Sequence, residues 1–190
     1  DAQESRGLGD VYKRQDIIIT TGGVSVGKKD IMHESLRLMG AERIFWRVKM
    51  KPGMPTLFSA YKKTSDITAT DNCASEREIP IISLSGNPFG VAVSIELLIR
   101  PALEKMMQDP SIGLKEVNGI MADNFEKGIK GRRFIRAYLE NGKFHLPNGL
   151  HSNGVLSSMA GCNCLIDTKT MENQESRSLN AGDKVGAILL

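Results

Sequence analysis

The chain has 190 residues, of which 41% are hydrophobic, so it can form one large or two small domains with buried cores. Its formal net charge is only +3 at pH 7, which suits small anionic ligands better than a nucleic acid, whose binding needs a concentrated basic stripe. No apolar run approaches the roughly 20 residues that cross a membrane, and residues 1–15 lack the apolar stretch of a secretory leader. We therefore expect a cytoplasmic protein without membrane or nucleic-acid partners.

Residues 1–15 show neither helix nor strand periodicity and look foreign to the domain, so we expect the fold to begin at Asp16. From there to residue 110, apolar β-branched runs alternate with amphipathic stretches, as is typical of an α/β domain. The pattern predicts strands at 17–20, 44–50, 56–61 and 79–84 and helices at 30–39 and 88–108. The first strand reads as buried on both faces, which favours an open, mostly parallel sheet.

The two predicted helices carry recognisable boundary residues. Asp30 is expected to cap the first helix and Gly40 to follow its end. Asn87 is expected to cap the second, with Pro88 in its first turn and Pro101 as a kink.

Residues 111–190 differ in character and read as a second, mostly β domain. Short strands are predicted at 117–121, 133–140, 143–146, 164–167 and 184–190. Asn141-Gly142 is a strong signal for a two-residue hairpin turn. One helix is expected at 153–160, and a turn at 180–183 precedes the last strand.

The cysteines and histidines indicate neither a disulfide framework nor a metal site. Three cysteines are an odd number, and Cys162 and Cys164 lack the two-residue gap of a zinc or redox pair. The histidines are scattered without metal-binding spacing. We expect reduced thiols and packing or surface histidines.

A glycine-rich loop at residues 21–27 follows the first predicted strand. Its glycines let backbone N–H groups turn toward an anion, and Thr21 and Ser25 add hydroxyl donors. The spacing also fits a nucleotide-binding P-loop, but Lys29 stands where that loop needs a Ser or Thr for Mg²⁺. An ordinary turn without a ligand is the other alternative.

Two further anion-friendly turns, at residues 51–55 and 85–88, also follow apolar strands. Loops at the carboxyl ends of parallel strands share one rim of the sheet, so all three turns could line a single crevice. Their coincidence favours a pocket for a phosphate or another oxyanion.

Five motifs together resemble the MoeA family of molybdopterin molybdenumtransferases over residues 16–190. They are Thr-Gly-Gly-Val-Ser-Val-Gly with Asp30, Lys-Pro-Gly-x-Pro, Ser-Gly-Asn-Pro, Ser-Ser-Met-Ala and a late Ala-Gly-Asp. The resemblance implies a molybdopterin-binding α/β domain at 16–110, without its first strand and helix, and a small all-β barrel at 111–190. It also implies insertion of molybdate into adenylated molybdopterin with release of AMP, assisted by Mg²⁺, in a homodimer whose partner subunit completes the site.

The resemblance assigns roles to residues of the α/β half. Those of the first and third turns would bind the substrate: Thr21, Gly22, Gly23, Ser25, Gly27, Ser85, Gly86, Asn87 and Pro88. Asp30 would be an essential acidic residue, as a Mg²⁺ ligand or a proton relay, unless it serves only as the helix cap. Lys51, with Pro55, would hold molybdate, because an ammonium group suits a compact oxyanion. Arg47 matches a basic position of the family, although a solvated strand residue is equally expected.

In the β half, Arg132, Arg133 and Arg136 lie where the family places an arginine that faces the metal oxyanion, and Ser157 or Ser158 adds a hydroxyl. Of these, Arg133 and Ser158 are expected to touch the substrate, while a solvated arginine face is the plainer alternative. Met54 stands where many members have a second lysine, which weakens the expected hold on molybdate.

The family's long N-terminal domains have no counterpart in this sequence, so the chain alone is not expected to turn over. A non-catalytic binding or scaffolding module of the same family is the second hypothesis. A stand-alone nucleotide hydrolase is the third hypothesis. It requires a Mg²⁺-binding hydroxyl in the glycine-rich loop, which Lys29 does not supply.

Overall fold

The computed structural model describes residues 15–64, 76–126, 131–148, 156–168 and 178–190. Its internal contacts divide the chain into two compact units. The first unit ends at Arg47 and resumes over Pro55–Leu84, and the second comprises Val48–Met54 and Ser85–Leu190. Because this division does not follow the chain order, the domain boundary expected near residue 110 stays a prediction. In the described part of the chain, no helix is long and apolar enough to span a membrane.

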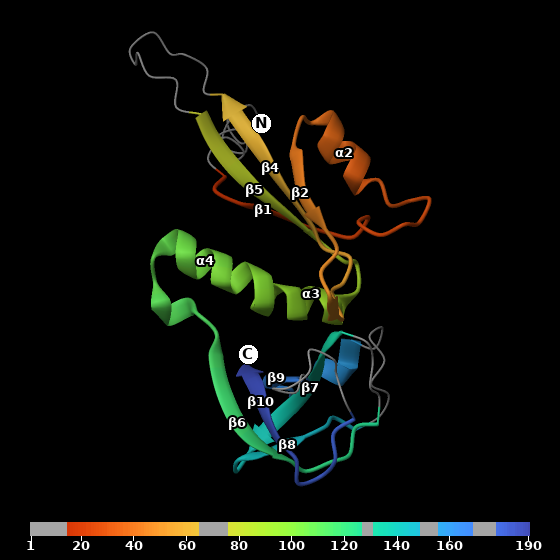
Figure 1. Ribbon diagram of the computed structural model, residues 1–190, viewed down its shortest axis with the longest axis vertical. Coiled ribbons are helices and arrows are strands. Elements are labelled where there is room, and N and C mark those ends of the chain that lie inside the picture. Colours follow the sequence, from red (N-terminus) through yellow and green to blue (C-terminus); the bar gives the residue numbers. More distant parts are fainter. Residues whose placement is uncertain (1–14, 65–75, 127–130, 149–155, 169–177) are drawn as a thin grey trace, which may run out of the picture. The chain divides into compact units, whose positions relative to one another are not determined.

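The first unit is built on a four-stranded sheet (Figure 1). Its strands, in spatial order, are β1 (Ile18–Thr21), β5 (Glu76–Leu84), β4 (Leu57–Thr64) and β2 (Glu42–Trp46). Only the β1–β5 pair is parallel, and β5–β4 and β4–β2 are antiparallel. The expectation of a mostly parallel sheet is therefore wrong. Connections too short for a helical crossover join β2 to β4 and β4 to β5, and such connections favour antiparallel neighbours.

Burial differs sharply between the two parallel strands. In β5, Ile81 and Leu84 are almost fully buried, as its continuous apolar run predicts. In β1, burial alternates and Ile19 is 43% exposed, because β1 lies at the edge of the described sheet. The expectation that this first strand is buried on both faces is wrong.

Among the described residues, the helix α2 (Met32–Leu38) accompanies this sheet. Its Leu36 packs with Val24, Leu57 and Ile81 in the core of the unit. Gly40 follows the helix with φ +78, the left-handed conformation expected of a glycine there.

The strand expected at 44–50 is interrupted. β2 ends at Trp46, Arg47 takes the left-handed conformation with φ +72, and β3 (Met50–Lys51) pairs with a strand of the second unit. A residue with a backbone φ in this range cannot continue a β-strand, so the chain leaves the first sheet at Arg47.

The second unit begins with a long helical run, composed of α3 (Pro88–Ser94), the π-helical turn η1 (Ile95–Ile99) and α4 (Arg100–Met107). Asn87 caps it as predicted, because its side chain accepts a hydrogen bond from the Gly90 N–H at 3.0 Å. The π-helical turn ends at Ile99, two residues before Pro101, which cannot donate a backbone hydrogen bond, and the kink expected at Pro101 stays a prediction. A short 3-10 turn, η2 (Pro110–Ile112), follows.

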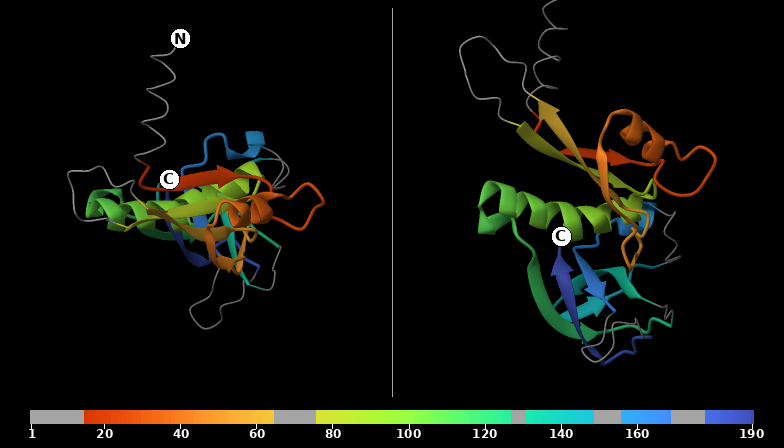
Figure 2. Two further views of the ribbon diagram at one scale, coloured as in Figure 1. Left: turned by 90° about the horizontal axis from the view of Figure 1, so that it is seen from above. Right: turned by 45° about the horizontal axis from the view of Figure 1, so that its top comes forward.

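Five strands of the second unit close into a barrel (Figure 2). They pair around the ring in the order β7 (Arg132–Glu140), β8 (Lys143–His145), β6 (Lys115–Met121), β10 (Lys184–Leu189) and β9 (Cys164–Asp167), with β9 returning to β7. The small all-β barrel expected in this half is thereby confirmed. Asn141 and Gly142 both have positive φ, as the predicted hairpin between β7 and β8 requires.

The barrel has an inner and an outer apolar cluster. The inner cluster includes Ile135, Phe144 and Ile166, all almost fully buried. The outer cluster joins Phe134 of β7 to Phe89 and Val93 of α3. The 3-10 helix η3 (Leu156–Met159) occupies part of the helix expected at 153–160, whose first three residues lie outside the described part.

Candidate functional site

The glycine-rich loop is fixed at both ends. Gly22 and Gly23 have φ of +86 and +67, which L-residues with side chains rarely adopt. The Gly22 N–H donates to the Leu84 carbonyl at 2.9 Å, and the Met32 N–H donates to the Gly23 carbonyl at 3.0 Å. The loop is therefore held between the end of β5 and the start of α2.

The middle of the loop is held by one buried side chain and one tryptophan. Val24 is only 1% exposed and belongs to the core of the first unit. The Trp46 indole N–H donates to the Val24 carbonyl at 2.9 Å. Beyond Val24, residues 25–29 are exposed, and in the described part of the chain the Ser25 and Val26 N–H groups have no acceptor. These donors can face an anion.

Asp30 closes the loop rather than capping the helix. Its Oδ2 accepts a hydrogen bond from the Gly27 N–H at 2.6 Å, while its own N–H donates to the Gly27 carbonyl at 2.9 Å. The residue preceding α2 is Ile31, which has no side-chain cap. The expectation that Asp30 is the N-cap is wrong, because its carboxylate satisfies a loop amide three residues earlier.

The other two predicted turns lie together within the second unit. A β-carbon on Gly53 would lie 2.7 Å from Ser94 Oγ and 3.4 Å from the Gly90 carbonyl. A β-carbon on Gly90 would lie 2.6 Å from Ser85 Oγ and 3.4 Å from the Gly53 nitrogen. The two glycines thus allow the Lys-Pro-Gly turn to pack on the start of α3. The 21–27 loop belongs to the first unit, so one crevice shared by all three turns stays a prediction.

Lys51 and Arg133 are neighbours in one sheet. β3 pairs in parallel with β7, and its register matches Met50 with Arg132 and Lys51 with Arg133. Residues matched in this way project to the same face of a pleated sheet. Lys51 is exposed and makes no ion pair with any described residue. Two cations are therefore side by side on the rim of the barrel.

The three arginines of β7 have separate environments. Arg132 pairs with Asp167 at 2.8 Å and lies over the Phe134 ring. Arg136 is 2% exposed, its guanidinium lies 4.3 Å from the Phe89 ring centroid, and burial lowers its pKa. Arg133 lies between these extremes and is the arginine matched to Lys51.

Hydrogen bonds from Thr168 fix the backbone at Arg133. Its carbonyl accepts hydrogen bonds from both the N–H and the hydroxyl of Thr168, at 2.9 and 3.0 Å. Its guanidinium lies 5.1 Å from the Phe125 ring centroid, and burial lowers its pKa. A partly buried guanidinium gains more from a bound anion than an exposed one does.

The remaining predicted site residues are more dispersed. The Arg47 guanidinium lies 4.1 Å from the Trp46 ring centroid, so this arginine is oriented by stacking. Gly86 and Pro88 are exposed at the start of α3. Contacts place Pro55 with the first unit, although its turn begins in the second. Ser157 is exposed in η3, and the Ser158 side chain lies outside the described part.

Metal ligands do not gather anywhere in the described residues as a group of three or more His, Cys, Asp or Glu side chains. Asp30 is thus a single carboxylate beside a glycine loop. Mg²⁺ held by one carboxylate draws its other ligands from water and substrate phosphates, and this arrangement is compatible with a phosphate-bearing ligand.

Sequence reasoning misses two contributors to these sites. The sequence assigns Trp46 no role at the site, yet its indole N–H binds the glycine loop and its ring lies against the Arg47 guanidinium. The approach of Gly53 to Gly90 is also unforeseen, although a glycine in each turn is a signal for close backbone approach.

Two family models match the chain. One, described as "Probable molybdopterin binding domain", matches residues 8–105, and the other, "MoeA C-terminal region (domain IV)", matches residues 118–190.

Relatives of known name are molybdopterin molybdenumtransferases. That of Staphylococcus aureus is 30% identical over 183 residues, which are 95% of this chain and 39% of that protein. That of Bacillus subtilis is 28% identical over 160 residues, covering 83% of this chain and 34% of the relative. The chain thus spans less than half the length of these relatives.

Solved structures of the same kind share the fold. The molybdopterin biosynthesis MoeA protein from Pyrococcus horikoshii OT3 superposes with a TM-score of 0.63 at 21% identity, covering 96% of this chain and 37% of that one. A molybdenum cofactor biosynthesis protein from Pyrococcus furiosus gives a TM-score of 0.62 at 17% identity, covering 96% and 52%.

Proposed function

Because the chain belongs to the molybdopterin-binding domain family and continues into a MoeA C-terminal region, we propose that it forms part of a molybdopterin molybdenumtransferase. The proposed reaction inserts molybdate into the dithiolene of adenylated molybdopterin and releases AMP. Its molybdate site lies at Lys51 and Arg133, and its phosphate site lies at the 21–27 loop.

The observation that carries the proposal is the register of β3 and β7. It matches Lys51 with Arg133 on one face of the sheet. Like charges at matched positions of neighbouring strands destabilise a sheet. A dianion bound between them turns this repulsion into two attractions, and a compact tetrahedral oxyanion can contact an ammonium and a guanidinium together. Molybdate has this shape and charge.

The glycine loop supports the phosphate part of the proposal. Its ends are fixed by hydrogen bonds, and its exposed residues after Val24 include Ser25 and Val26, whose N–H groups have no acceptor in the described part of the chain. A loop held in this way loses little conformational entropy when an anion binds. Gly22 and Gly23 supply the two left-handed residues that create the turn.

Asp30 is proposed as the acidic group of the reaction. The Gly27 N–H fixes one carboxylate oxygen, Oδ2, with a hydrogen bond of 2.6 Å, and no hydrogen bond to the other oxygen, Oδ1, is found in the described part of the chain. Oδ1 would hold Mg²⁺ together with substrate phosphate oxygens, or would accept a proton. When bound, Mg²⁺ would neutralise phosphate charge as AMP leaves.

The substrates, the homodimer and the cytoplasmic location are part of the same proposal, which concerns the whole protein rather than this stretch alone. Met54 carries no charge, so the proposal assigns the molybdate affinity to Lys51 and Arg133. The non-catalytic scaffolding alternative would use the same fold without a response to molybdate.

The test uses the intact protein that contains this chain, adenylated molybdopterin and molybdate, with AMP release as the measurement. Asp30→Asn keeps an acceptor for the Gly27 N–H and removes the charge, so insertion should fall by more than about tenfold with little loss of stability. Asp123→Asn, in the second unit, is the matched control and should leave AMP release unchanged. Molybdate-dependent AMP release by Asp30→Asn at the wild-type rate would remove Asp30 from the reaction.

A further inference from the structure

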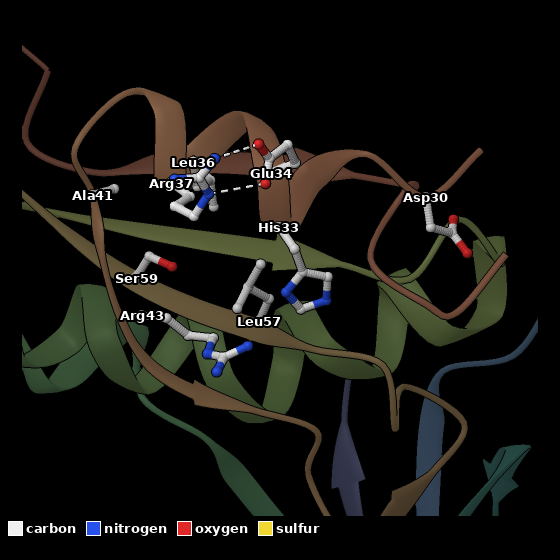
Figure 3. Close-up of a pocket in the computed structure, with 9 residues that line it drawn as sticks. All are labelled: Asp30, His33, Glu34, Leu36, Arg37, Ala41, Arg43, Leu57 and Ser59. Carbon is white, nitrogen blue, oxygen red and sulfur yellow. Dashed lines mark hydrogen bonds and ion pairs between the residues drawn. The ribbon is translucent and has the colours of Figure 1, made fainter. Parts of the chain in front are cut away.

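A cavity of about 400 Å³ lies within the first unit between α2 and strands β2 and β4 (Figure 3). Its apolar part is formed by Leu36 and Leu57, which are 5% and 1% exposed. Its polar part is formed by His33 of α2 with Arg43 and Ser59 of the sheet. The volume is within the range of roughly 300–1,000 Å³ typical of small-molecule pockets.

The strand register directs Arg43 into this cavity. Arg43 is matched with Ser59 across β2 and β4, so both side chains lie on the face that Leu57 also occupies. An irregularity between Arg43 and Phe45 shifts the register directly afterwards. Such bulges re-aim side chains, and Figure 3 shows the Arg43 side chain extending below Leu57 toward the His33 ring.

The acidic groups around the cavity are already engaged. Glu34 forms two hydrogen bonds with Arg37, at 2.6 and 2.9 Å, and Asp30 Oδ2 accepts the Gly27 N–H. By contrast, the Arg43 side chain makes no ion pair or hydrogen bond with any described residue. His33 Nε2 is buried and has no hydrogen-bond partner in the described part of the chain.

An unsatisfied buried nitrogen costs free energy, and a ligand that supplies its partner recovers that cost. The cavity thus combines the guanidinium of Arg43, the buried Nε2 of His33 and an apolar surface. These features fit a ligand with an oxyanion at one end and a hydrocarbon body.

We propose that this cavity binds a small organic anion. Its phosphate or carboxylate head contacts Arg43 and His33, and its apolar body rests on Leu36 and Leu57. This goes beyond the proposed molybdenum insertion, because Asp30 is the only residue of that proposal that lines the cavity, and it lies at the edge opposite Arg43 (Figure 3).

The experiment titrates phenyl phosphate into the chain and follows the emission of Trp46, the only tryptophan. The His33 ring meets Trp46 edge-on with 4.6 Å between centroids, so a ligand on His33 perturbs this reporter. Calorimetry measures the affinity independently. We expect saturable binding of phenyl phosphate, about tenfold or more tighter than inorganic phosphate or phenol alone. A parallel titration with benzoate distinguishes a phosphate-selective head site from one for carboxylates.

Arg43→Gln and His33→Phe should each weaken phenyl phosphate binding by about tenfold or more, since each removes a hydrogen bond to a charged group. His33→Phe retains a ring against Trp46, and urea unfolding checks that both variants are folded. Lys62→Ala is the matched control, because Lys62 is on β4 two strand positions from Ala60, on the face opposite Ser59.

The proposal would be overturned by the absence of saturable binding, by wild-type affinity for phenyl phosphate in folded Arg43→Gln, or by an equal loss of affinity in Lys62→Ala. Displacement of phenyl phosphate by adenylated molybdopterin would also overturn it, by assigning the cavity to the substrate site. Arg43→Gln should still release AMP at the wild-type rate in the intact protein, so the two proposals can fail separately.

Discussion

The close approach of Gly53 to α3 leads to the most specific stability prediction. Gly53→Ala adds a β-carbon 2.7 Å from both Met50 Cε and Ser94 Oγ, at a backbone φ of +99. The left-handed backbone alone costs roughly 1–2 kcal/mol for a residue with a side chain. Overpacking a filled interior costs about 1–3 kcal/mol more. We therefore expect a loss of about 2–5 kcal/mol in the free energy of unfolding, from the sum of these two costs.

Gly182→Ala separates the two costs. Gly182 has φ +94, close to that of Gly53, but a β-carbon added there would meet no atom within 4 Å. Urea unfolding with linear extrapolation should show a loss of about 1–2 kcal/mol for this control. Ser94→Ala should recover part of the larger loss when it is combined with Gly53→Ala, because it removes one of the two clashing atoms. Equal losses for the two glycine variants would refute the packing argument.

Two further predictions concern the first unit and the barrel. Trp46→Phe removes the hydrogen bond to the Val24 carbonyl, so unfolding free energy should fall by about 1–3 kcal/mol and amide exchange should quicken at residues 22–27; unchanged exchange there would show that Trp46 does not hold the loop. Burial raises the pKa of the Cys164 thiol from 9.0 to about 12, so the folded state retains a proton that the unfolded state loses between these pH values. Stability should be fully present below pH 9 and decline toward pH 12, and Cys164→Ala should flatten this decline; an equally steep decline in that variant would assign it to other groups.

Much of the fold can be predicted from local patterns. The apolar run of β5 and the Asn141-Gly142 hairpin depend on residue types that restrict the backbone directly. The Asn87 cap likewise depends on a side chain and an amide three residues apart. Such signals are short-range, so tertiary structure rarely overrides them.

The failures share a different cause. Apolar runs predict a mostly parallel sheet, but strand direction is set by pairing partners, and β4 lies antiparallel to both of its neighbours. The sequence predicts that Asp30 caps the helix, because the position of an Asp before a helix favours this role. The sequence does not indicate that the Asp30 carboxylate instead accepts the Gly27 N–H. The sequence predicts one strand at 44–50, but the chain passes from one sheet to another within it. The positive φ of Arg47 causes this change, and the pattern of apolar residues does not indicate it.

For the candidate site, the sequence suggests residue types but not which of them become neighbours. Lys51 and Arg133 are 82 positions apart, and only the register of β3 and β7 brings them onto one face. The three arginines of β7 look alike in sequence. Their roles separate because Arg132 pairs with Asp167 and Arg136 lies buried against Phe89.

The central claim is that Lys51 and Arg133 bind molybdate together, and a double-mutant cycle on molybdate binding tests it most directly. Calorimetry on the intact protein would compare the wild type, Lys51→Ala, Arg133→Ala and the double variant, with Lys49→Ala as the matched exposed control. The account predicts that each single variant weakens binding by about tenfold or more, and that the double variant loses less than the sum of the two losses. Wild-type affinity in either single variant, or strictly additive losses, would contradict it.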